Sequence, residues 1–257
     1  MKRTTLTALA GVLALTAGSL AAWSSGAASA IPANIAAAVA DPARTADDKT
    51  ADANRKPAET LQFIGVKPGM KVVDFWPGGG YFSRLLSAAV GPKGKGYAFV
   101  PQEIAKFPKV VMPANGSHPD PARPNITAVV SPIMGFSTPE PVDIVWTAQN
   151  YHDLHDPFAG PADMLAFDKA VYKSLKPGGY FVILDHSAPD GSGAASTNTT
   201  HRIDAALVKQ EVLAAGFKFV GESNILRNPA DPRTALVFDP AIRHHTDQFI
   251  YKFQKPK

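Results

Sequence analysis

The sequence predicts a doubly wound, Rossmann-like α/β fold with a seven-stranded sheet and a late antiparallel strand. Three observations indicate this fold. Short apolar runs alternate with amphipathic helical segments four or five times along the chain, which is typical of a parallel sheet with crossover helices. A turn with three consecutive glycines follows the first apolar run. Two apolar runs, at 217–222 and 246–253, close the chain as a final strand pair, from which we expect the antiparallel strand.

Residues 1–30 have the features of a secretory signal peptide. Lys2 and Arg3 make a basic start, residues 6–22 are apolar, and the small residues at 28–30 are typical of a cleavage site. The alternative is an uncleaved membrane anchor, which the scarcity of large apolar side chains in this stretch disfavours. We therefore expect a periplasmic or secreted protein that has no stable membrane span after the signal is cleaved.

Composition limits the partners and the chemistry. The 257 residues include 26 Lys and Arg, 22 Asp and Glu, and no cysteine. No basic block stands out, so we expect no nucleic-acid partner. The lack of thiols excludes disulfide, thiol and cysteine–zinc chemistry. We expect a partly helical surface lead-in at 31–56, one domain at 57–257, and a small-molecule substrate.

The segment 70–91 combines a strand, a glycine turn and a helix. Its apolar run, 72–75, carries Asp74 near the end, and Pro77 with three glycines then forces a tight turn. Apolar residues recur at helical spacing over 85–90. In an open parallel sheet, ligands bind beyond the carboxyl ends of the strands. A carboxylate at that position repels phosphate and suits a cationic or amine-bearing ligand.

Residues 72–80, Val-Val-Asp-Phe-Trp-Pro-Gly-Gly-Gly, resemble the first motif of class I S-adenosylmethionine (SAM)-dependent methyltransferases. Asp74 falls on the acidic position, Gly78 and Gly80 fall on the later glycines, and Trp76 stands where the family usually has its first glycine. The resemblance implies SAM as co-substrate, with Asp74 positioning the methionine amine. The glycines would let the ligand approach the backbone.

The elements on either side of this motif follow in order. We expect a short helix at 57–64 and strands at 95–100 and 126–130, with a proline-rich loop at 107–125 between these strands. Methyltransferases usually carry an acidic residue at the end of the second strand, where it accepts the ribose hydroxyls. In this chain, the resemblance gives that role to Glu103.

A polar segment follows the fourth strand, which we expect at 142–146. Residues 150–153, Asn-Tyr-His-Asp, resemble the post-strand-four motif of a group of predicted exported bacterial methyltransferases of unassigned substrate. In the wider superfamily, this segment touches the methionine end of SAM and the methyl acceptor, so the resemblance implies that Gln149 and Asn150 bind the co-substrate. The alternative is a polar loop whose aspartates cap helices.

Two histidines and a tyrosine are the candidate catalytic residues. His152 and His186 both follow predicted strands at the edge where ligands bind, and the ordinary pKa of histidine, about 6.5, suits a general base. Tyr151 would orient the acceptor or contact the sulfonium through its ring face. The fifth strand, at 180–185, leads into His186. It is preceded by Leu-Lys-Pro-Gly-Gly at 175–179, which resembles the start of strand five in small-molecule methyltransferases.

The remaining segments complete the predicted fold. An amphipathic helix is expected at 162–175, a mobile Ser/Gly/Thr-rich loop at 187–200, and a further helix at 201–215. Together these features predict SAM-dependent methyl transfer to an unidentified small-molecule acceptor, without a metal ion. The candidate cofactor-binding residues are Asp74, Trp76, Gly78, Gly79, Gly80, Glu103, Gln149 and Asn150.

Three alternatives stay open at this point. One is an exported methyltransferase-fold protein that binds a metabolite or partner without methyl transfer, because Trp76 takes the space of a glycine and SAM is made in the cytoplasm. A second, NAD-dependent oxidation, is disfavoured because the turn lacks the Gly-x-Gly-x-x-Gly pattern. The third is metal-assisted hydrolysis, although the spacing of the polar residues matches no established zinc motif. It would use His152, Asp153, His155, Asp156 and His186.

Overall fold

The computed structural model describes residues 30–257, of which 31–257 form one compact unit. The predicted signal peptide therefore lies, apart from Ala30, outside the described residues and stays a prediction. Among the described residues, none of the helices combines the length and hydropathy that crossing a bilayer requires.

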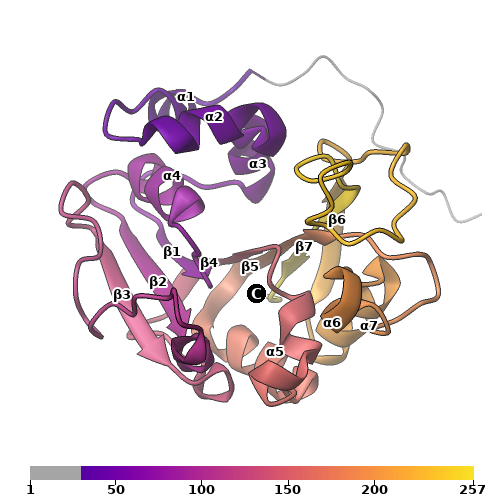
Figure 1. Cartoon of the computed structure of the whole chain (residues 1–257). Helices are drawn as coiled ribbons and strands as arrows, with labels where there is room; N and C mark the ends of the chain where they lie inside the picture. The colour runs from indigo at the N-terminus through magenta and orange to yellow at the C-terminus, as the bar shows by residue number, and fades with distance from the viewer. Residues whose placement is uncertain (1–29) are drawn as a thin grey trace, which may run out of the picture. The chain divides into compact units, whose positions relative to one another are not determined.

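The sheet has seven strands in the order β3-β2-β1-β4-β5-β7-β6 (Figure 1). All pairings are parallel except those of β7, which runs antiparallel to both of its neighbours, β5 and β6. This topology confirms the predicted fold class, including the late antiparallel strand. The strands are β1 (Lys71–Phe75), β2 (Lys95–Pro101), β3 (Ile126–Ser131), β4 (Val142–Ala148), β5 (Leu175–His186), β6 (Lys218–Ser223) and β7 (Gln248–Gln254).

Helices cover both faces of the sheet, with α1 to α4 on one side and α5 to α7 on the other (Figure 1). Short 3₁₀ turns follow several strands. The α-helices are α1 (Ala33–Val39), α2 (Ala46–Arg55), α3 (Pro57–Ile64), α4 (Tyr81–Val90), α5 (Met164–Ser174), α6 (Thr197–Thr200) and α7 (Ala205–Ala214). The 3₁₀ turns are η1 (Gln102–Lys106), η2 (Ile133–Gly135), η3 (His152–His155) and η4 (Pro157–Ala159).

Alternating side chains along each central strand build two separate hydrophobic cores. In β1, Val72 packs in the core beneath α3 and α4, whereas Val73 packs in the core beneath α5 and α7. In β4, Trp146 joins the first core and Val145 joins the second. Burying each such side chain contributes about 1.5–3 kcal/mol, so the period-two pattern fixes which face of the sheet each helix covers.

Residues 31–56 differ from the predicted surface lead-in. The segment forms α1 and α2, and Ile35 of α1 is fully buried in the same core as Leu85 of α4. Arg44 connects the two helices, because its guanidinium donates to Val39 O of α1 at 2.8 Å and pairs with Asp52 of α2 at 2.9 Å. The compact unit thus begins near residue 31 rather than at 57.

Capping residues account for two shifted helix boundaries. The helix predicted at 162–175 begins at Met164, because the Asp163 side chain accepts from Ala166 N at 3.0 Å and caps it. The helix predicted at 201–215 begins only at Ala205, because the Asp204 side chain caps α7. The loop predicted at 187–200 contains the short helix α6, which ends where His201 adopts a left-handed conformation.

Candidate functional site

The glycine turn lies at the carboxyl end of β1. Trp76, Gly78 and Gly80 have positive φ values of 60°, 54° and 79°, a region that costs a tryptophan about 1–3 kcal/mol. A methyl group added to Gly78 or Gly79 would meet no atom within 4 Å, so both residues face open space. The turn therefore presents bare backbone to whatever occupies that space.

Two cavities meet at this turn. The first, of about 530 Å³, lies between α2, the turn and the end of β4. The second, of about 490 Å³, lies between the turn, β2 and the loop at 107–125. The residues that line both cavities are Trp76, Pro77, Gly78, Gly79 and Arg84. An elongated ligand that lies across the glycines would occupy both cavities.

Asp74 lies in the floor of the first cavity. Its side chain is almost completely buried, and its carboxylate accepts a hydrogen bond from Ser83 Oγ at 2.6 Å. Burial raises the pKa of Asp74 to about 6, and the Ser83 hydrogen bond and the charge of Arg55 only partly oppose this rise. At neutral pH the carboxylate is therefore mainly ionised.

Two arginines line the first cavity. Arg84 forms a bidentate pair with Asp48 at 2.6 and 2.7 Å and donates to Gly79 O at 2.9 Å, which fixes the shape of the turn. Arg55, at the end of α2, lies 4.6 Å from the centre of the Tyr81 ring. Sequence analysis missed both arginines. No local motif marks Arg55 of α2 as part of a site formed at β1, and Arg84 of α4, although it lies within the segment 70–91, was not identified as a site residue.

Trp76 leaves the cavities open. Its indole packs edge-on against Phe158 with the ring centres 5.8 Å apart, and it forms part of the wall of both cavities. Trp76 O accepts from Asn150 Nδ2 at 3.0 Å, and the same nitrogen lies 2.7 Å from Ala148 O. Asn150 thus braces the turn after β1 against the end of β4.

Gln149 also lines the first cavity and has a positive φ of 62°. Its backbone N–H donates to Leu184 O at 2.7 Å, which fastens the bend to β5. Its side-chain amide donates to Gln248 Oε1 at 3.2 Å, and Gln248 in turn donates to Thr246 Oγ1 at 3.1 Å. Thr246 Oγ1 lies 2.7 Å from His186 Nδ1, so hydrogen bonds connect the cavity wall to this histidine.

Glu103 and Tyr151 lie elsewhere. The Glu103 carboxylate accepts from Ile133 N at 2.9 and 3.1 Å and lines neither cavity, so the structure does not bring it to the predicted ribose position. Tyr151 is completely buried in the core under α5, and its hydroxyl lies 3.0 Å from Asp168 and 3.1 Å from Glu211. The predicted contact of Tyr151 with acceptor or sulfonium is wrong, because its ring points into the core.

The two candidate bases differ in protonation. Burial lowers the pKa of His152, but the carboxylates of Asp185 and Asp153 outweigh this effect and raise it to about 10. Burial lowers the pKa of His186 to about 3. At neutral pH, His152 is therefore an imidazolium and His186 a neutral imidazole, and neither side chain lines the two cavities.

His152 belongs to a polar cluster that local sequence did not reveal. Its Nδ1 lies 2.7 Å from Asp185 Oδ1, and its Nε2 lies 3.2 Å from His201 Nδ1. Packing of α6 against η3 brings His201 to this position from 49 residues away. Two residues of the metal-site alternative diverge from this cluster, since His155 faces Glu211 at 3.3 Å and His186 faces Thr246.

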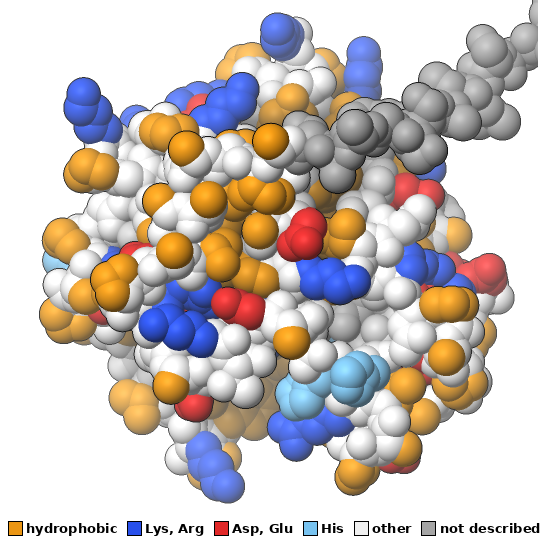
Figure 2. Space-filling view, turned by 90° about the horizontal axis from the view of Figure 1, so that it is seen from above, with side chains coloured by type: hydrophobic (Ala, Val, Ile, Leu, Met, Phe, Trp, Pro, Cys, Tyr) orange, Lys and Arg blue, Asp and Glu red, His pale blue; other side chains and the backbone are white. Residues whose placement is uncertain are grey.

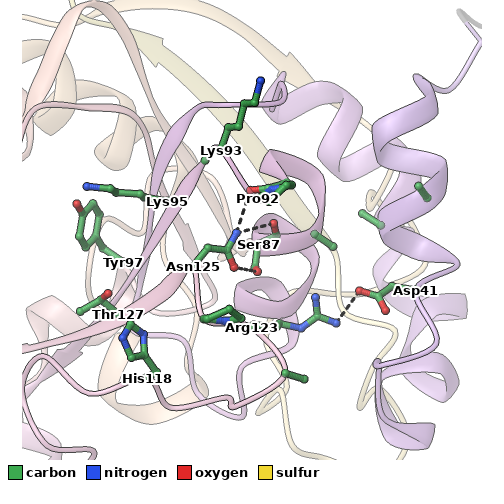
Figure 3. A pocket seen from close by; sticks show the side chains of 17 residues that line it. Asp41, Ser87, Pro92, Lys93, Lys95, Tyr97, His118, Arg123, Asn125 and Thr127 are labelled. Atoms are coloured by element: carbon green, nitrogen blue, oxygen red, sulfur yellow. Dashed lines mark hydrogen bonds and ion pairs between the residues drawn. The ribbon is translucent and has the colours of Figure 1, made fainter.

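A larger cavity, of about 770 Å³, lies at the opposite edge of the sheet (Figure 3). It lies beside the first residues of β2 and β3, whereas ligands of open α/β sheets bind at the carboxyl ends. Its polar groups pair with one another. Asn125 accepts from Ser87 Oγ at 2.6 Å, and Arg123 pairs with Asp41 at 2.9 Å (Figure 3). We therefore place the candidate site at the glycine turn.

Figure 2 shows one face of the molecule, on which basic, acidic and apolar side chains are interspersed. Proteins that bind nucleic acids typically gather lysine and arginine into a continuous stripe or patch on one face. On the face that Figure 2 shows, lysine and arginine side chains do not form a continuous patch of this kind.

Solved structures share this fold. A SAM-dependent methyltransferase from Aquifex aeolicus aligns with a TM-score of 0.50 and 20% identity over 77% of this chain and 88% of its own. The N-methyltransferase NodS from Bradyrhizobium japonicum aligns at 0.50 and 15% identity, over 82% of this chain and 99% of its own. The [4+2]-cyclase SpnF aligns at 0.52 and 14% identity, over 82% and 81%.

The chain has a Rossmann-like methyltransferase fold. No family model matches it, and the search of curated proteins gave no match. At these identities the likeness establishes the fold alone, and the cyclase shows that the same fold also occurs in a protein named for other chemistry. The function must therefore be argued from the site.

Proposed function

We propose that this protein binds SAM across its glycine turn and transfers the methyl group to a small-molecule acceptor. The observation that carries the proposal is the pair of open cavities that meet at Gly78 and Gly79, above the buried carboxylate of Asp74. When bound, SAM supplies an electrophilic methyl group on a sulfonium. The chain's own residues would hold the two ends of SAM and align the acceptor.

The first cavity fits the methionine end of SAM. An amino acid carries an ammonium and a carboxylate, and this cavity presents the ionised Asp74 near the Arg55 guanidinium. Trp76 lines the same space, and its ring face would stabilise a nearby sulfonium by a cation–π contact. In this proposal Asp74 has the role that the resemblance implies, Trp76 takes the sulfonium contact that the sequence analysis gave to Tyr151, and Arg55 adds a partner for the carboxylate.

The second cavity fits the adenosine end. Its walls are largely apolar, which suits an aromatic base. They include Ala98, Val100, Ile104, Met112 and Ile126. The only acidic residue that lines this cavity among the described residues is Asp120, in the loop after β2. We assign Asp120, rather than Glu103, to the ribose hydroxyls.

Alignment of donor and acceptor would supply most of the rate enhancement, because orientation alone contributes about 7–11 kcal/mol in favourable cases. For a hydroxyl or amine acceptor, we assign the proton acceptor to His186, since His152 already carries a proton at neutral pH. The low pKa makes His186 a weak base. We therefore expect its contribution to fall near the lower end of the usual range of about 10²–10⁴-fold.

Titration calorimetry of residues 31–257 with SAM and with its demethylated product tests the proposal. Arg55→Gln removes the carboxylate partner, and Gly79→Leu fills the space over the turn at a position without positive φ. We expect both to weaken binding at least tenfold. Arg243→Gln, at an exposed arginine outside both cavities, serves as the matched control and should bind as the unaltered chain does. No heat at millimolar SAM would contradict the proposal.

The second candidate function is ligand binding without methyl transfer. It is favoured by the position of both histidines outside the cavities. Under this alternative, SAM or a related nucleoside binds and Arg55→Gln weakens it, but radiolabelled methyl groups never leave SAM in the presence of candidate acceptors. Methyl transfer that His186→Asn slows would exclude the binding-only function.

The proposal includes export, which the basic start and apolar stretch of residues 1–30 favour. Sequencing the N-terminus of the protein isolated from a producing bacterium tests it. A mature chain that begins near residue 31 in the periplasm or medium is the expected outcome. An intact Met1 in the cytoplasm would contradict export and remove the conflict with the site of SAM synthesis.

A further inference from the structure

The cluster around His152 contains three potential metal ligands that converge on one point. His152 and Asp153 belong to η3, after β4, and His201 follows α6. His152 Nε2 lies 3.2 Å from His201 Nδ1 and 3.3 Å from Asp153 Oδ1, and the latter two atoms are 3.7 Å apart. None of the three side chains lines the glycine-turn cavities.

These separations match the ligand spacing of tetrahedral zinc. Zinc bonds of about 2.0–2.2 Å to imidazole nitrogen and carboxylate oxygen place neighbouring ligands about 3.3–3.6 Å apart. An ion about 2.1 Å from all three atoms would lie slightly out of their plane and keep a fourth position open. Two histidines with one carboxylate and an open position are a donor set of catalytic rather than structural zinc sites.

Asp185 orients the central ligand. Its carboxylate accepts from His152 Nδ1 at 2.7 Å and from the backbone N–H groups of His152 and His186, each at 2.8 Å. An ionised carboxylate can only accept, so Nδ1 keeps its proton, and Nε2 would offer its lone pair to an ion that displaces the proton it carries in the metal-free chain. A carboxylate behind a histidine in this way is the usual outer partner of a metal-binding imidazole.

The surroundings favour a cation. Asp156 is completely buried next to η3, and neither of its carboxylate oxygens has a hydrogen-bond partner of ordinary length among the described residues. Asp156 N donates to Asp153 O at 3.1 Å, which places Asp156 beside the cluster. The side chains of His201 and Asp153 are 31% and 13% exposed, so the cluster lies near the surface.

We propose that His152, Asp153 and His201 bind one divalent transition-metal ion of the zinc class, with Asp185 as the positioning residue. The fourth coordination position would take water or an oxygen, nitrogen or sulfur atom of a ligand. This site is independent of the proposed methyl transfer. It corrects the metal-site alternative drawn from the sequence, which contained His152 and Asp153 but not His201.

The test uses residues 31–257 without a polyhistidine tag, stripped with a chelator and dialysed. Zn²⁺ is titrated by calorimetry, and Co²⁺ replaces it to report coordination through its visible absorption. We expect one ion per chain and the intense spectrum of four-coordinate cobalt. His201→Ala should weaken Zn²⁺ binding by more than about 100-fold, and Asp185→Asn by about 10–100-fold, as is typical of an outer partner.

His245→Ala, which removes an exposed histidine outside the cluster, is the matched control and should keep full affinity. His201 is partly exposed, so its alanine variant should stay folded, which circular dichroism of the metal-free chain checks. Sub-stoichiometric Zn²⁺ binding, or equal binding by His201→Ala and the unaltered chain, would overturn the proposal. SAM titrations of His201→Ala separate the two sites, because we expect its SAM affinity to be unchanged.

Discussion

Asp74, His152 and His186 are all buried, yet their neighbours set them in different protonation states. Burial disfavours charge on each of them, as the raised pKa of Asp74 and the lowered pKa of His186 show. Only His152 has two adjacent carboxylates that outweigh burial and keep it protonated. The residue type alone therefore predicts neither the charge of these side chains nor their chemistry.

The first prediction concerns Asp74. An acid whose pKa is about 6 in the folded chain and 3.8 when unfolded destabilises the fold once pH exceeds its ordinary value, because the folded chain must give up a more strongly held proton. We expect Asp74→Asn to raise the unfolding free energy at pH 7 by up to about 3 kcal/mol and to lose SAM affinity. Denaturant unfolding and calorimetry measure the two effects, and a destabilised variant would contradict the first.

The second prediction concerns pH. Because the pKa of His152 is raised from 6.5 to about 10, its contribution to stability is complete below pH 6.5 and is lost as pH rises toward 10. His152→Gln cannot take up this proton. We expect its melting temperature to fall less between pH 6.5 and 10 than that of the unaltered chain, with His245→Ala as control. Both chains are stripped of metal with a chelator beforehand, because a bound ion would displace the proton of His152. Equal slopes would show that His152 is not charged in the metal-free chain.

At the scale of single elements, the connection from α4 to β2 depends on close backbone packing. A methyl group added to Gly94 would lie 2.8 Å from Met70 O and 2.6 Å from Val90 Cγ2, distances that require a backbone shift. At Gly221 in β6, the same addition meets nothing within 4 Å. Lack of space for a side chain therefore requires glycine at position 94, whereas position 221 has room for one.

The third prediction follows from this contrast. Gly94→Ala should destabilise the protein by about 1–3 kcal/mol through overpacking. Gly221→Ala should be neutral or stabilising by up to about 1 kcal/mol, because it restricts the unfolded chain. Urea denaturation of the two variants side by side provides the measurement. Equal stabilities would show that the Gly94 turn relaxes without cost.

At the scale of the whole molecule, residues 31–56 connect the stability of the fold with the site. Ile35 fills the core beneath α4, while Arg55 reaches the cavity beside the glycine turn. The turn itself is held from this segment through the pair between Asp48 and Arg84. The segment therefore completes both the core and the candidate binding site.

The fourth prediction tests this dual role. We expect the melting temperature of a chain that begins at residue 57 to lie about 3–12 °C below that of the chain 31–257. Loss of the burial of Ile35 alone removes about 1.5–3 kcal/mol of stability, and the other lost contacts add to this. It should also lose SAM affinity, because Arg55 and Asp48 are gone. Differential scanning calorimetry measures the first effect. Unchanged melting and SAM binding would restore the interpretation of 31–56 as a surface lead-in.

The fold was predictable because its signals are local. Period-two runs, helical spacing and glycine turns arise from residues close in sequence, and all seven predicted strands are present. Six of them end within two residues of the predicted bounds, whereas β5 begins at Leu175 rather than at 180 and includes the predicted turn at 175–179. The site was only partly predictable. Asp74 and Gly78 were found because the motif is contiguous, whereas Arg55, Arg84 and Asp120 reach the cavities from other elements.

The sequence by itself determined the order of strands and helices, the antiparallel last strand and the bare glycine turn, because each depends on neighbours along the chain. Only the tertiary structure decided that Tyr151 points into the core, that Glu103 binds a backbone amide, and that His201 meets His152. The physical reason is that direction, burial and charge partners depend on residues distant in sequence. Packing of the elements, rather than their local pattern, brings these residues together.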